Sequence, residues 1–72
     1  MSKREKFVRL AESRVNKALK DIQLIGNLSN RSAYDFDEKD LRKIFGALQK
    51  ALEGARTRFD RTSEASQNEF RL

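Results

Sequence analysis

Apolar side chains recur every three or four residues along two long segments, and no other feature constrains the fold as much. Residues three and four apart share one face of an α-helix, so each segment is predicted to be an amphipathic helix with one apolar stripe. In the segment 3–25 the stripe is Val8, Ala11, Val15, Ala18, Ile22 and Ile25. In the segment 38–61 it is Leu41, Ile44, Phe45, Leu48, Leu52, Ala55 and Phe59.

Capping signals indicate where the two helices begin. Ser2 and Glu5 have the S-x-x-E spacing of a capping box, in which side chains bond to backbone N–H groups at a helix start. Asp37 is placed to cap the second helix. Glu38 and Asp40 add negative charge at the positive end of that helix. Both starts therefore lie shortly before the apolar stripes.

The connecting stretch "LIGNLSNRSAYDFD", residues 24–37, differs from both helices in composition. Gly26 or Asn30 can take the left-handed conformation that often ends a helix. Phe36 and Leu41 have the spacing of a hydrophobic staple across the next helix start. Most of this junction is thus expected to stop one helix and begin the next.

The sequence predicts an all-α chain with one domain, residues 1–61, folded as an antiparallel two-helix hairpin. The helices are expected at about 3–25 and 38–61, joined by a junction at 26–37. Residues 62–72 continue without an apolar stripe, so we expect a frayed or disordered tail there.

Two helices alone do not cover stripes of this width, and the small residues of the first cannot cover the large ones of the second. Uncovered apolar surface marks an interface, so we expect two copies of the hairpin to form a homodimeric four-helix bundle. Burial against a different protein is the alternative. The residues expected at the dimer or core interface are Val15, Ile22, Phe45, Leu48, Leu52 and Phe59.

The composition argues against an enzyme. The chain of 72 residues has no His and no Cys, so it lacks the usual general base, the thiol nucleophile and the ligands of a zinc site. Capping explains the acidic residues near residue 38 without catalysis. We therefore expect no catalytic residue, no metal site and no cofactor. No apolar run approaches a membrane span, and residues 1–10 lack the apolar core of a signal peptide, so a cytoplasmic protein without a membrane partner is expected.

The net charge of +5 lies wholly in residues 1–31, which hold eight basic and three acidic side chains, whereas residues 32–72 hold eight of each. A basic face opposite the first apolar stripe could neutralise phosphates of a nucleic acid, a partner that we favour less than a second copy because the face has no series of stacking aromatics. Asn30 and Arg31 have no evident structural role. The candidate partner or phosphate contacts are Lys6, Arg9, Lys17, Lys20, Asn30 and Arg31.

The run "LIGNLSNRSAYDF" followed by the acid-capped "DEKDLRKIFGAL" resembles a group of small uncharacterised bacterial proteins that share an LIGNLSNRS-type junction. The resemblance covers about residues 5–55. It implies a bacterial cytoplasmic origin and carries no activity, cofactor or binding residue.

These features together predict a small non-enzymatic protein-interaction or regulatory module that self-associates through its apolar helix faces. One alternative is a nucleic-acid-binding accessory protein that uses the basic face of the first helix. Another is a small inhibitor or antitoxin-like protein that binds a partner protein. Leu10 and Leu24 fall outside the stripe of the first helix and favour a partner.

Overall fold

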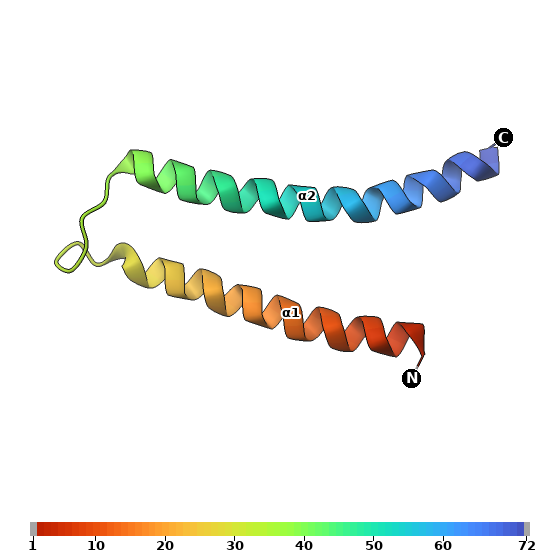
Figure 1. Ribbon diagram of the computed structural model, residues 1–72, viewed down its shortest axis with the longest axis horizontal. Helices are drawn as coiled ribbons and strands as arrows, with labels where there is room; N and C mark the ends of the chain where they lie inside the picture. The colour runs from red at the N-terminus through yellow and green to blue at the C-terminus, as the bar shows by residue number, and fades with distance from the viewer. Residues whose placement is uncertain (1, 72) are drawn as a thin grey trace. The chain divides into compact units, whose positions relative to one another are not determined.

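The computed structural model describes the backbone of residues 2–71 and the side chains of residues 2–62. Within this range every regular element is a helix: α1 at Lys3–Gly26, the short 3₁₀ helix η1 at Asn27–Ser29, and α2 at Glu38–Arg71 (Figure 1). The predicted all-α class is confirmed. The chain divides into two units, residues 1–35 with α1 and η1, and residues 36–72 with α2.

Helix α1 begins where the sequence predicted, with the Ser2 half of the predicted capping box. Ser2 has extended backbone angles, φ −73° and ψ 163°, and its Oγ accepts a hydrogen bond from the Glu5 N–H at 3.0 Å. The Ser2 carbonyl accepts the next bond, from the Lys6 N–H at 3.0 Å. The first bond satisfies the Glu5 N–H, which has no backbone acceptor within the helix, and the second is the first regular bond of the helix.

The expectation of a left-handed residue at Gly26 or Asn30 is wrong, because no residue in the described part of the chain has a positive φ. Gly26 keeps helical angles, φ −59° and ψ −30°, and α1 passes directly into η1. The tighter turn can satisfy terminal carbonyls through i→i+3 bonds, so no left-handed cap is needed. The chain leaves the helical region at Asn30, whose ψ is 100°.

Asn30 organises the turn that follows η1. Its Oδ1 accepts hydrogen bonds from the Ser32 N–H at 3.1 Å and from the Ser32 hydroxyl at 2.6 Å. Its backbone carbonyl accepts bonds from the N–H groups of Ala33 and Tyr34, at 3.1 and 3.0 Å. This is the local side-chain-to-backbone bonding that favours Asn in turns, and it gives Asn30 a structural role that the sequence pattern had not revealed.

Helix α2 begins with a reciprocal pair of bonds between two aspartates. The Asp40 N–H donates to Asp37 Oδ1 at 2.9 Å, and the Asp37 N–H donates to Asp40 Oδ2 at 3.0 Å. Phe36 and Leu41, the two residues of the predicted staple, are both half-buried beside mostly exposed neighbours. The cap predicted at Asp37 is confirmed, and Asp40 completes a capping box with Asp in place of Glu.

Helix α2 extends to Arg71, whereas the sequence pattern predicted an end near residue 61. The added segment contains no Pro and no Gly, and its Glu, Ala, Gln and Arg residues have high helix propensity, so nothing in it forces an earlier stop. The tail predicted to be frayed or disordered covers residues 62–72. Apart from Thr62, the side chains of these residues lie outside the described part of the chain. That expectation stays a prediction.

Candidate interaction surfaces

The large apolar side chains of both helices remain accessible to solvent. Among residues 2–62 no side chain is buried, and the large apolar ones on the two stripes range from half-buried to 72% exposed at Leu52. Of the six predicted interface residues, Val15 and Ile22 share the stripe of α1 and the other four share the stripe of α2. Each helix thus presents one continuous apolar face.

The width of each stripe indicates how many neighbours it needs. At 3.6 residues per turn the large apolar residues of each stripe spread over about 100° of the helix circumference. A two-helix seam uses a narrower stripe, with only two positions in seven, whereas the wider arc is typical of helices in bundles of three or more. Each stripe is therefore suited to contact two neighbouring helices.

The face of α1 opposite its stripe is basic, as the sequence predicted. Lys17 forms an ion pair within α1, because its Nζ lies 3.0 Å from Asp21 Oδ2 one turn away. Lys6, Arg9 and Lys20 form no ion pair with any carboxylate of residues 2–62, and all three are exposed. Three of the four predicted phosphate contacts on this helix thus have no carboxylate partner among residues 2–62.

The other two predicted contacts, Asn30 and Arg31, lie in the turn after η1 and are separated along the chain from the basic face of α1. The Asn30 Oδ1 accepts hydrogen bonds from the backbone N–H and the hydroxyl of Ser32. Arg31 is exposed. The hydrogen bonds of Asn30 therefore give it a structural role in the turn, separate from the basic face of α1.

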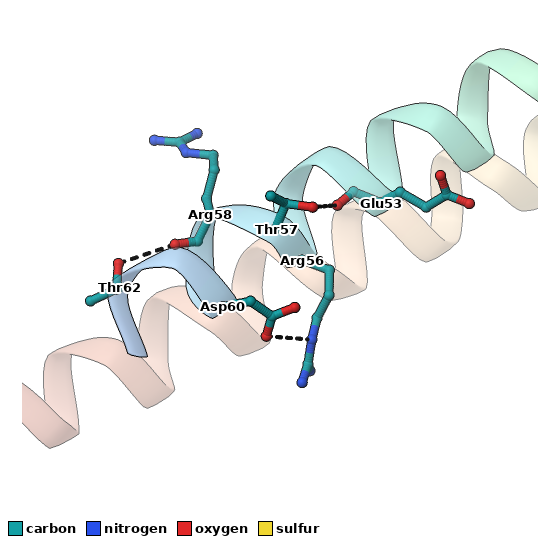
Figure 2. A network of polar contacts seen from close by, with 6 residues as sticks. All are labelled: Glu53, Arg56, Thr57, Arg58, Asp60 and Thr62. Carbon is teal, nitrogen blue, oxygen red and sulfur yellow. Dashed lines mark hydrogen bonds and ion pairs between the residues drawn. The ribbon is translucent and has the colours of Figure 1, made fainter. Parts of the chain in front are cut away.

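A row of local polar contacts follows the later part of α2 (Figure 2). Arg56 Nε lies 3.2 Å from Asp60 Oδ1. The hydroxyl of Thr57 donates to the Glu53 carbonyl at 2.9 Å. The Arg58 guanidinium points away from the helix in Figure 2 and has no ion pair with the described carboxylates.

A charge pattern that the sequence reading missed lies along the two edges of the α2 stripe. Glu38 and Arg56 lie on one edge, and Asp40 and Arg58 lie on the other, so each edge carries an acid early in α2 and an arginine five turns later, with Arg42 and Asp60 about 40° further out beside the first edge. Because residues 32–72 carry no net charge, the net charge of each half of the chain does not reveal this order of acidic and basic residues. The order appears when each charged residue is placed by its angle around the helix.

The described range has no group of three or more Asp, Glu, His or Cys side chains that could hold a metal ion, and none of the described helices has the length and apolar content of a membrane span. Comparison with models of protein families, with curated proteins and with solved structures found no match.

Proposed function

We propose that the chain is a non-enzymatic protein-interaction or regulatory module of the cytoplasm, without a cofactor, that acts as a self-associating helical hairpin. In this proposal α1 and α2 fold back on each other and two copies form a four-helix bundle. The apolar stripes face inward and the basic face of α1 faces outward.

The width of the accessible apolar stripes is the observation that carries this proposal. A hairpin covers about one side of each stripe, and residues such as Leu52, 72% exposed, need a further neighbour. A second copy supplies two more stripes of the same width, and a two-fold axis lets each copy cover the other with the same residues. Covering apolar surface contributes roughly 25 cal/mol per Å², which makes association favourable.

Sedimentation equilibrium over about 1–100 µM protein tests the proposal, since self-association depends on concentration. The wild-type chain is expected to sediment as a dimer. Leu52→Asp should shift it to monomer, because it places a charge in the stripe. Thr57→Asp adds the same charge on the opposite face and should leave the dimer intact. A folded wild-type monomer across this range would contradict the proposal.

A second candidate function, binding to nucleic acid, is favoured by one observation. Lys6, Arg9 and Lys20 are exposed, share a face of α1 and have no carboxylate partner among the described residues. Each phosphate that such residues neutralise releases counterions, so the affinity should fall steeply with salt.

Fluorescence anisotropy with a generic DNA duplex and a single-stranded RNA, at about 50 and 200 mM salt, tests this candidate. The triple variant Lys6→Gln, Arg9→Gln, Lys20→Gln should lose binding. The matched triple variant Lys39→Gln, Lys43→Gln, Lys50→Gln removes the same charge from α2 and should retain most of it. No binding by the wild-type chain at the lower salt would rule the candidate out.

A further inference from the structure

The two charged edges of α2 share one spacing. Glu38 and Arg56 are 18 residues apart, and so are Asp40 and Arg58. Because an α-helix has 3.6 residues per turn, this separation equals five whole turns, and the two members of each pair project in the same direction. Each edge of the apolar stripe therefore carries an acid near the start of α2 and an arginine five turns later.

We infer that α2 pairs with α2 of a second copy in an antiparallel orientation, and this inference rests on the proposed self-association through the apolar faces. A two-fold axis perpendicular to two antiparallel helices brings the same edge of each copy together. Glu38 then faces the partner's Arg56, and Asp40 faces the partner's Arg58. A symmetric dimer makes each of these contacts twice.

A parallel pair has the opposite electrostatics. Its two-fold axis runs along the helices and sets unlike edges side by side, so Glu38 lies beside the partner's Asp40 and Arg56 beside the partner's Arg58. Like charges at such flanking positions disfavour a pairing and thereby select orientation. The charge order of α2 thus fits the antiparallel pair and opposes the parallel one.

One position of the axis suits both the charges and the apolar residues. With the axis level with Leu48, each charged pair is offset by about 3 Å along the helix, which a long arginine side chain can span. Two of the apolar layers, those of Phe45 and Leu41, then combine a large residue with a small one, as close packing requires. The facing pairs are Leu48 with Leu48, Ile44 with Leu52, Phe45 with Ala51, and Leu41 with Ala55.

The arginines are available for these contacts. Arg58 has no ion pair with a carboxylate of residues 2–62, as stated above. Arg56 pairs with Asp60, but the side chains are 79% and 50% exposed, and an exposed pair one turn apart contributes little to stability. Exchanging Asp60 for the partner's Glu38 therefore costs little.

Disulfide crosslinking tests the orientation in the full chain, which has no cysteine of its own. Leu41→Cys and Ala55→Cys are oxidised gently, each alone and as an equilibrated mixture. The mixture should give a disulfide-linked dimer because the two positions face each other. Neither variant alone should crosslink, because each cysteine lies about 21 Å along the axis from its counterpart, beyond disulfide reach.

Charge exchange tests the predicted contacts. Arg56→Glu and Glu38→Arg should each weaken dimerisation about fivefold, because two attractive contacts per dimer become repulsive. The double variant should return to within about twofold of the wild type, and high salt should reduce all these differences. Arg61→Glu is the matched control, since it makes the same charge change away from the stripe and should have no effect.

The outcomes separate this inference from the function on which it rests. Self-linking of Leu41→Cys would show a parallel pair, and a dimer that crosslinks in no sample would show a different interface. Either result, or a double charge variant as weak as the single ones combined, overturns the antiparallel pairing and leaves self-association standing. A wild-type monomer in sedimentation overturns both.

Discussion

Helices α1 and α2 each have one apolar stripe, but their charged residues are placed differently relative to that stripe. In α1 the basic residues lie on the face opposite the stripe, where Lys6, Arg9 and Lys20 have no carboxylate partner among the described residues. In α2 the charges along the stripe change sign from one end to the other. We propose an anionic partner for the first arrangement and another copy of α2 for the second. Two helices with similar apolar stripes can thus carry their charges in different places around the helix, which net charge alone does not reveal.

The two helices also differ in how they start. The first turn of α1 is capped by the Ser2 hydroxyl, whereas α2 starts with two reciprocal bonds between Asp37 and Asp40. Acidic charge at the start of α2 also interacts favourably with the positive end of the helix dipole. The start of α2 is therefore the more strongly specified of the two.

Truncating the two stripes should produce the largest difference between the helices. In the proposed bundle Leu48→Ala is expected to cost about 3 kcal/mol, because it leaves a cavity in the central layer. Val15→Ala removes less volume and should cost about 1.5 kcal/mol. Urea unfolding followed by far-UV circular dichroism, at one fixed protein concentration, measures both. Equal and negligible losses would show that neither stripe is covered.

Removing the caps should have the next largest effect. Asp37→Ala is expected to lower the free energy of unfolding by about 1–2 kcal/mol, and Ser2→Ala by about 0.5–1 kcal/mol. Asp37→Ser keeps an acceptor oxygen at the cap and should recover most of the loss. The same urea titrations provide the values. A larger loss from Ser2→Ala would reverse the comparison between the two helix starts.

Glycine replacement in α2 should raise stability. A Cβ at Gly46 or Gly54 would meet no atom within 4 Å, and both residues lie opposite the stripe. Gly46→Ala and Gly54→Ala are each expected to add up to about 1 kcal/mol. Ser13→Ala, on the corresponding face of α1, should add about 0.5 kcal/mol or less. Thermal unfolding gives the order, and a destabilised Gly46→Ala would show that this face of α2 is packed against a neighbour.

Breaking the two exposed ion pairs should change stability least. Asp21→Asn and Asp60→Asn are each expected to cost about 0.5 kcal/mol or less, and the cost should disappear at high salt. The two variants differ in association. Asp60→Asn releases Arg56 for the partner's Glu38 and should tighten dimerisation slightly, whereas Asp21→Asn should not affect it. Sedimentation equilibrium compares them, and identical behaviour would weaken the proposed pairing of α2.

The period of the apolar residues predicted both helices, because side chains three and four apart share a face whatever surrounds them. The capping residues predicted where the helices start. Net charge by halves located the basic face of α1 but missed the edges of α2. The charge order along those edges is found only when the charged residues are placed by their angle around the helix over five turns.

The sequence alone determined the all-α class, the two apolar stripes and the caps at Ser2 and Asp37. These depend on interactions within one or two helical turns, which the order of residues sets directly. Only the structure decided that α1 ends through η1 without a left-handed residue, that Asn30 bonds to Ser32, and that Asp40 bonds back to Asp37. Several residues of the junction can form competing side-chain-to-backbone hydrogen bonds, and the backbone angles of single residues decide which of these bonds form.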